Sequence, residues 1–128
     1  MATVFIDTNV VLRYLLGDIK SQYKQAENIL KQAEKNEIKV FISILVIDEL
    51  IWALNRYYQI PKKSFIPALL NILSIKNIQI FEAKKDLIIN LLQSMVTREI
   101  DFTDLYLSKI ATKEQLFSFD KDFKKLFN

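Results

Sequence analysis

Short apolar segments alternate with amphipathic helical segments along the chain, and this alternation constrains the fold more than any other feature. Strands that are apolar along their length are typical of a parallel sheet whose strands are connected by helices. The predicted strands are residues 3–6, 39–42, 77–81 and 116–119, and the main predicted helices are residues 10–16, 21–37, 43–58, 61–73, 85–96, 105–111 and 121–127. The sequence therefore predicts one three-layer α/β domain over residues 1–128, with a parallel sheet of four or five short strands.

The composition limits where the chain can work and what it can bind. Hydrophobic residues make up 51% of the 128 residues, yet no apolar run reaches the roughly 18 residues of a membrane span. The N-terminus lacks a basic region followed by an apolar one, so we expect a cytoplasmic protein. The net charge of +3 permits binding to a polyanion without demanding it.

The chain contains no cysteine and no histidine. This excludes disulfides, thiolate chemistry, zinc sites of the Cys/His type and a histidine general base. Any catalysis must use carboxylates, hydroxyls, amides, lysines or arginines. Hard cations with oxygen ligands, such as Mg²⁺ or Mn²⁺, are the natural complement to these groups.

Acidic residues occur where the strands and helices of such a sheet would form a site. Asp7 and Asp120 each follow a predicted strand, Asp104 lies at the start of the helix before the last strand, and Glu49 lies in the helix after the second strand. Sites in open α/β sheets form beyond the carboxyl ends of the strands. We expect the acids to meet if the first and last strands are neighbours.

Each acid also has a simpler structural interpretation. Asp7 is a good helix N-cap, and Asp101 with Asp104 has the spacing of a cap and a first-turn acid. Glu49 can be a solvated helix residue, and helical periodicity does not say whether it or Asp48 points inward. A turn accounts for Asp120 or its neighbour Asp122.

Four motifs in order resemble those of the PIN-domain family, in particular the VapC-type toxin ribonucleases of type II toxin–antitoxin systems. The matching segments are residues 5–13 (FIDTNVVLR), residues 42–50 (ISILVIDEL), residues 101–105 (DFTDL) followed by Ile110 and Ala111, and residues 117–123 (FSFDKDF). Each motif alone is short, and their specificity lies in the four occurring together in sequence order.

The resemblance implies a metal-dependent endoribonuclease with a PIN-like fold. The acids at the motif positions would be catalytic and would bind Mg²⁺ or Mn²⁺, and they are Asp7, Glu49, Asp104 and Asp120. A cation would relieve the repulsion between such carboxylates and activate a water for attack on a phosphodiester. We expect Thr8, Asn9 and Ser118 to orient ligands or waters around them.

The resemblance also implies partners. The substrate would be RNA, with tRNA or ribosomal RNA as the favoured class, and a cognate VapB-like antitoxin would inhibit the enzyme. We expect basic side chains near the motifs to contact phosphates, although each can equally be a solvated surface residue; these are Arg13, Lys109, Lys113 and Lys121. Surplus apolar side chains can serve a homodimer or antitoxin surface as well as the core, and they are Leu12, Tyr14, Leu15, Trp52, Tyr57 and Tyr58.

Two other functions compete with this interpretation. A phosphotransfer domain also has an aspartate after its first strand, but an acid phosphatase needs a second acid where this chain has Asn9. A receiver domain needs an Asp after a central strand, where Phe81 is followed by Glu82. A PIN-like scaffold that binds RNA or protein without catalysis is the stronger alternative, and metal binding distinguishes it from an enzyme.

Overall fold

The computed structural model describes residues 1–127, apart from the side chain of Lys124. Helices and short strands alternate through the first three quarters of the chain, as predicted. The elements are β1 (Ala2–Phe5), α1 (Thr8–Leu16), α2 (Lys20–Glu34), β2 (Ile38–Ile42), α3 (Ile44–Trp52), η1 (Ala53–Tyr57), α4 (Lys62–Leu73), β3 (Ile78–Ile80), α5 (Lys85–Met95), α6 (Phe102–Ile110) and η2 (Lys121–Phe127).

The three strands form a parallel sheet in the order β1-β2-β3, with β2 in the centre. Val4 is aligned with Val40 and Val40 with Ile78, so the apolar residues of all three strands lie in rows on one face. Val40, Ile42 and Ile78 on this face are fully buried. Because these side chains are removed from water together, the face forms the centre of the core.

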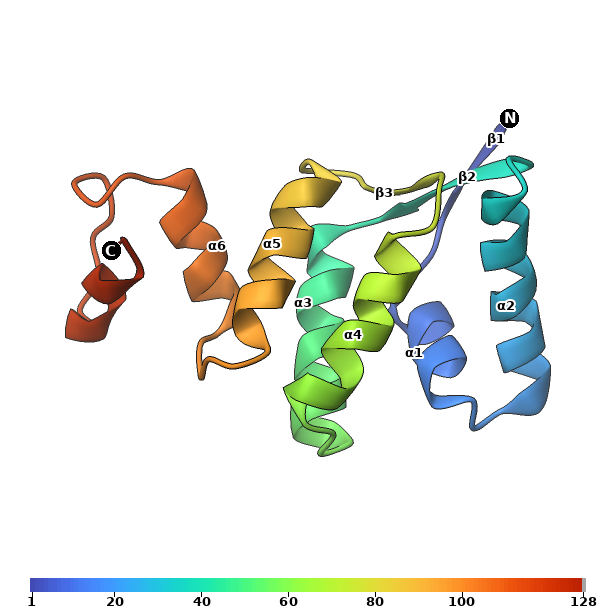
Figure 1. Ribbon diagram of the computed structural model, residues 1–128, viewed down its shortest axis with the longest axis horizontal. Helices are drawn as coiled ribbons and strands as arrows, with labels where there is room; N and C mark the ends of the chain where they lie inside the picture. The colour runs from blue at the N-terminus through green and yellow to red at the C-terminus, as the bar shows by residue number, and fades with distance from the viewer. Residues whose placement is uncertain (128) are drawn as a thin grey trace.

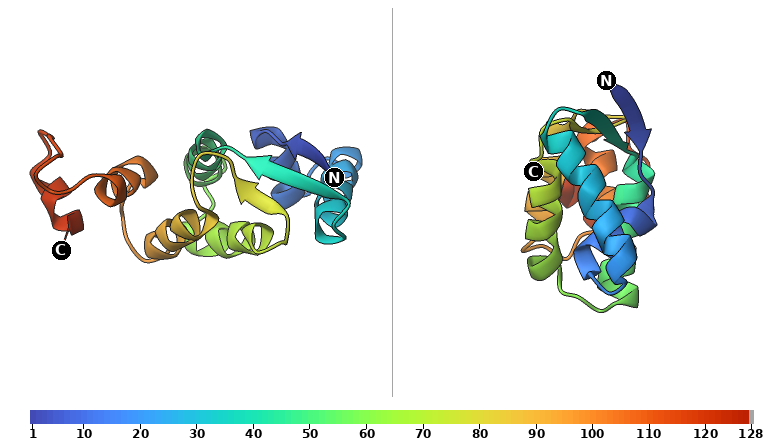
Figure 2. Two further views of the ribbon diagram at one scale, coloured as in Figure 1. Left: turned by 90° about the horizontal axis from the view of Figure 1, so that it is seen from above. Right: turned by 90° about the vertical axis from the view of Figure 1, so that its right-hand side faces the viewer.

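Helices α1 to α5 lie below the sheet in Figure 1, and the view from above in Figure 2 places the strands over them. Helix α2 contacts β2, while α4 and α5 contact β3. The α/β class with a parallel sheet and flanking helices is therefore confirmed.

Local sequence signals set the ends of several helices where they were predicted. Asp7 caps α1 at its start, and Gly17 ends that helix in the left-handed conformation with φ 61°, which costs glycine little because it has no Cβ. Ser43 caps α3, its hydroxyl oxygen accepting a hydrogen bond from the backbone N–H of Leu45.

The predicted fourth strand over residues 116–119 is wrong, because the sheet has three strands. Helix α6 and η2 extend away from the sheet at the end of the molecule opposite β1 (Figure 1). Without a neighbouring strand the backbone of residues 116–119 has no ladder to join. The segment instead makes local turns, in which Asp120 N donates to Ser118 Oγ and Asp122 N donates to Asp120 Oδ1.

The second face of the sheet is largely open, so the predicted three-layer arrangement is not formed by the described residues. Phe5, Phe41 and Phe81 pack against one another on this face with ring centroids 5.1–5.4 Å apart. Phe5 and Phe81 are each 58% exposed. Helices α1 to α5 lie on the other face of the sheet (Figure 1), so no helix of the described residues covers these rings.

The helix predicted over residues 43–58 changes type part of the way along. It is α-helical to Trp52 and continues to Tyr57 as a π-helix, in which Tyr58 N donates to Ala53 O at 2.9 Å. The wider hydrogen-bond spacing rotates the residues after Trp52 relative to those before it. Within residues 1–127, no helix is both long and apolar enough to cross a membrane.

Candidate active site

Asp7 lies just beyond the end of β1 and is the N-cap of α1. Its Oδ1 accepts a hydrogen bond from Val10 N at 3.1 Å, so the capping role considered from the sequence is present. The side chain is exposed. Because a carboxylate has two oxygens with several lone pairs, capping leaves Oδ2 free to bind a ligand.

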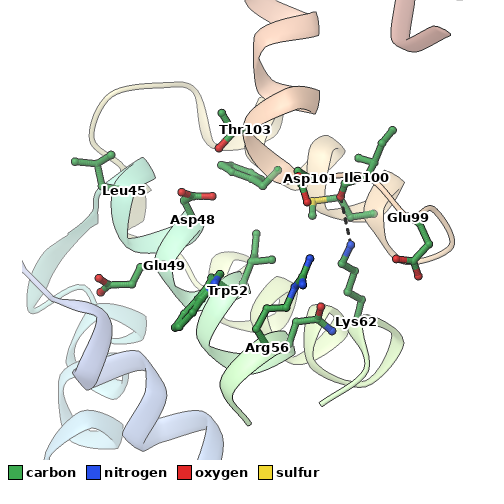
Figure 3. A pocket seen from close by; sticks show the side chains of 14 residues that line it. Leu45, Asp48, Glu49, Trp52, Arg56, Lys62, Glu99, Ile100, Asp101 and Thr103 are labelled. Atoms are coloured by element: carbon green, nitrogen blue, oxygen red, sulfur yellow. Dashed lines mark hydrogen bonds between the residues drawn. The ribbon is translucent and has the colours of Figure 1, made fainter. Parts of the chain in front are cut away.

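Helix α3 carries two exposed acids to different sides. In Figure 3, Glu49 points toward the ribbon of α1, whereas Asp48 points toward Thr103 at the start of α6. Helix α3 packs against both α1 and α6. The question left open by helical periodicity is therefore answered: neither acid points into the core.

Three more acids gather around the start of α6. Asp101 is the N-cap residue of this helix and Asp104 lies in its first turn. Partial burial raises the pKa of the Asp104 carboxyl, and the negative charges of Asp101 and Asp120 raise it further. The charge of Asp120 thus acts on the Asp104 carboxyl, while a common metal site for the four acids stays a prediction.

The four motif acids form two groups with α3 between them. Figure 1 shows α3 between α1, which Asp7 caps, and α6, whose first turn contains Asp104, and the charge of Asp120 acts on Asp104. Among residues 1–127, no three acidic side chains are close enough to hold one metal ion together.

Comparison with known protein families identifies the fold. A family model described as PIN domain matches residues 4–127. The chain belongs to the PIN-domain family. None of the curated proteins or solved structures compared with the chain gives a significant match. The match covers all four sequence motifs, and PIN domains are in general a nuclease fold.

The donor chemistry of this PIN domain suits a hard divalent cation. Every candidate ligand is a carboxylate oxygen, and the chain has no histidine or cysteine that would favour a softer metal. The raised pKa of Asp104 reflects partial burial and mutual repulsion among carboxylates, and a bound cation would relieve the repulsion. The candidate ligands therefore suit a hard divalent cation chemically, although they lie in two separate clusters.

The polar residues predicted to support the acids differ in accessibility. Thr8 is buried at the first position of α1, whereas Asn9 is exposed and lines a groove with Asp7 between α1 and α2. Ser118 is bound to the backbone of Asp120, which limits where that carboxylate can go.

The predicted phosphate contacts also divide into two kinds. Arg13 donates to Asp18, and this bond, followed by one with Tyr58, raises the pKa of the guanidinium. A phosphate would therefore have to compete with Asp18 for Arg13. The three lysines are all exposed: Lys109 lies on α6, Lys113 follows that helix and Lys121 begins η2.

A groove of about 1220 Å³ runs between α3 and the loop that leads into α6. Its volume exceeds that of a typical small-molecule pocket, so it suits an extended ligand. The sequence motifs did not mark three of its lining residues as part of a site: Trp52, Arg56 and Lys62. The sequence marks these residues only weakly. Trp52 and Arg56 follow Glu49 by three and seven residues, and this helical spacing is what places them on the same side of the helix as Glu49.

Glu82, which follows β3, holds the first turn of α3 in place. Its carboxylate accepts hydrogen bonds from Ser43 Oγ and from Ile44 N, the latter at 2.8 Å. Partial burial raises the pKa of this carboxyl, but the bonds from Ser43, from Ile44 and from its own backbone outweigh burial and hold the pKa below its ordinary value. A residue 38 positions away in the chain thereby anchors the helix that carries Glu49.

Replacing Glu82 with glutamine is expected to destabilise the PIN domain at pH 7 by about 1 kcal/mol, because charged hydrogen bonds at an exposed site become neutral ones. Folding lowers the pKa of the Glu82 carboxyl. The stabilisation is therefore fully present at a pH above the ordinary pKa of a glutamate, and it is lost as the pH falls through the pKa of the folded state. Urea unfolding of both proteins from pH 7 to pH 3 should show a difference that shrinks with acidity. A constant difference would contradict this role.

Proposed function

We propose that this PIN domain is a metal-dependent endoribonuclease of the VapC toxin type. The observation that supports the proposal is the PIN-domain match over residues 4–127, together with solvent-accessible carboxylates near both α1 and α6: Asp7, Glu49 and Asp120 are exposed and Asp104 is half-buried. Asp7 and Glu49 supply oxygens on the α1 side, and Asp104 and Asp120 supply them on the α6 side. Together they would hold one or two Mg²⁺ or Mn²⁺ ions.

Binding requires the two groups of acids to approach one another. Helix α6 has its main contacts with α3, α5 and η2 and none of comparable extent with the sheet. Loop residues 96–101 lead into it, so its position relative to α3 depends on a small interface. When a cation is present, its attraction for several carboxylates favours the arrangement in which the two groups of acids lie close together.

The residues of the chain would then act on a bound RNA strand. The bound cation would activate a water for in-line attack and stabilise the charge that develops on the phosphate. Asp104, whose pKa is raised by partial burial and by the charges of Asp101 and Asp120, would bind the cation as a carboxylate. Asn9 and Ser118 orient ligands or water, and Lys109, Lys113 and Lys121 neutralise neighbouring phosphates.

Cleavage of RNA is expected to require a divalent cation. Wild-type protein should cleave a mixed tRNA or ribosomal RNA substrate with Mg²⁺ or Mn²⁺ and lose at least about 100-fold of this rate in EDTA. Titration of Mn²⁺ by calorimetry should show binding without RNA. Cleavage that persists at full rate in EDTA, with contaminating nuclease excluded by a second purification, would contradict the proposal.

A non-catalytic scaffold is the second candidate, because no three acids in residues 1–127 stand together as a metal site. The same calorimetry separates the two functions: a scaffold binds RNA in EDTA and in Mg²⁺ alike, binds no Mn²⁺ and cleaves nothing.

The toxin role adds a partner to the enzyme. A VapB-like antitoxin would block the site, and a homodimer would cover part of the exposed apolar surface, which includes Tyr57. Growth arrest on expression, relieved by the product of a neighbouring reading frame, tests the toxin role. A chain that cleaves RNA in vitro without affecting growth would retain the nuclease function and lose the toxin role. A cytoplasmic location remains a prediction.

A further inference from the structure

The segment that follows α6 exposes two large apolar rings, and we call residues 111–127 the C-terminal arm. Phe117 is 83% exposed and Phe119 is 93% exposed. Their ring centroids lie 5.3 Å apart, so they contact each other while most of both rings stays in water. The main contacts of η2, at the end of the arm, are with α6. An apolar pair left in water in this way is typical of an interaction surface.

A second apolar surface lies on the sheet. Phe5 and Phe81 on its open face are each 58% exposed. Within residues 1–127, β1 pairs with β2 alone, so one of its edges is free. A free strand edge accepts an extended segment of another chain, whose alternate side chains add apolar contacts. Phe117 and Phe119 are two positions apart and therefore lie on the same side of such a segment.

We infer that two copies of the chain exchange C-terminal arms, so that the arm of one copy packs against β1 and the open sheet face of the other. Each active site then combines Asp7 and Glu49 of one copy with Asp120 of its partner. Asp104, which lies in the electric field of Asp120, approaches the site together with it. This inference rests on the proposed nuclease function and specifies which chain supplies each acid.

The positions of the acids relative to the aromatic rings favour this arrangement. Asp7 lies two residues after Phe5, and Asp120 directly follows Phe119. When Phe119 packs beside Phe5, Asp120 reaches the end of β1 where Asp7 lies, because extended segments side by side are about 4.8 Å apart. Within one chain, no three acids among residues 1–127 stand together. The arm of a second copy thus brings the acid that the site lacks.

The elongated shape of the molecule favours a second copy as the partner of the arm. Helix α6 and η2 lie at the end of the molecule opposite β1, with α3, α4 and α5 between them (Figures 1 and 2). To reach β1 of its own chain, the arm would have to cross these helices. A twofold axis perpendicular to the long axis instead brings each arm to β1 of the other copy. Both arms are then bound, and the assembly closes as a dimer.

The four exposed rings supply enough surface for a stable dimer. A phenylalanine side chain removes roughly 150–250 Å² from water when it is buried. Phe117 and Phe119 are almost wholly exposed, and Phe5 and Phe81 are more than half exposed. One arm on one sheet therefore covers roughly 600 Å² of ring surface, and the two equivalent contacts of a dimer cover roughly 1,200 Å². Specific interfaces begin at about this area, even before backbone contacts at the β1 edge are added.

Sedimentation velocity measures the exchange without RNA or metal. Wild-type protein should sediment as a dimer, and the double variant Phe117→Ser/Phe119→Ser as a monomer. Its circular dichroism spectrum should be unchanged, because both rings are exposed within one copy. Tyr57→Ser is the matched control and should stay dimeric, because Tyr57 is 71% exposed but lies on η1, outside both surfaces. A monomeric wild type, or dissociation by Tyr57→Ser and not by the arm variant, would overturn the inference.

A mixture of two inactive variants tests whether the partner completes the site. Asp7→Asn and Asp120→Asn should each be inactive alone. When they are unfolded together in urea and refolded in equal amounts, about half of the dimers contain one copy of each, and one site of such a dimer has all its acids. RNA cleavage in Mg²⁺ should therefore return to about one quarter of the wild-type rate. A mixture as inactive as its components would mean that Asp7 and Asp120 act within one chain, and the exchange would be disproved.

The two measurements distinguish failure of the exchange from failure of the nuclease function. If wild type cleaves RNA but the mixed variants do not, the nuclease function stands and the exchange fails. If wild type cleaves nothing in Mg²⁺ but forms a dimer that Phe117→Ser/Phe119→Ser dissociates, the exchange of arms stands and the nuclease function fails.

Discussion

Replacing Asp7 with asparagine is expected to reduce RNA cleavage by at least about 100-fold while the fold is retained. The substitution removes the negative charge that would bind the cation. It keeps the side-chain oxygen that accepts a hydrogen bond from Val10 N at 3.1 Å, and asparagine caps helices about as well as aspartate. The loss of activity can therefore be assigned to the missing ligand. Cleavage assays in Mg²⁺, with Mn²⁺ calorimetry on the same protein, provide the measurement.

The alanine variant of the same residue separates capping from catalysis. Asp7→Ala loses both the charge and the cap, so it should be as inactive as Asp7→Asn and also less stable by ~1 kcal/mol. Asp7→Asn should unfold at the same urea concentration as wild type. Full activity of Asp7→Asn in the presence of metal would rule out Asp7 as a ligand, and equal destabilisation of both variants would mean that the charge itself supports the fold.

The second large effect is expected in the core beneath α3. Leu50 is fully buried, whereas Leu45 on the same helix is 76% exposed. Leu50→Ala should lower the free energy of unfolding by ~2–5 kcal/mol, because it removes buried methyl groups and leaves a cavity. Leu45→Ala should change it by about 0.5 kcal/mol or less.

This pair of leucines tests the orientation of the helix that carries Glu49. Both substitutions make the same chemical change in one helix, so differences in helix propensity cancel and only burial distinguishes them. Urea unfolding at pH 7, followed by circular dichroism, measures the two free energies. Similar values would contradict the burial of Leu50 and, with it, the direction in which Asp48 and Glu49 point.

Much of the architecture could be predicted from local patterns. Strands β1, β2 and β3 are short runs rich in β-branched and aromatic residues, and their positions agree with the prediction to within about one to two residues. The caps at Asp7, Gly17 and Ser43 form bonds or backbone angles that depend on the nearest few residues. Such features are visible in the sequence because their causes are local.

Features that depend on distant residues were not predictable in the same way. Residues 116–119 have the composition of a strand, but a strand exists only with a neighbour to pair with, and α6 carries this segment away from the sheet. Glu82 anchors α3 by accepting hydrogen bonds from Ile44, which is 38 positions away in the chain, and from Ser43, which is 39 positions away. The exposure of Trp52 depends on how closely the loop before α6 approaches α3.

The sequence by itself determined the α/β class, the family motifs and an all-oxygen set of candidate ligands, because residue type and short-range periodicity encode these. The tertiary structure alone decided that Glu49 points toward α1 and Asp48 toward Thr103, that Asp104 lies in the field of Asp101 and Asp120, and that Trp52 lines an open groove. Those relations arise from the packing of helices that are distant from one another in the chain.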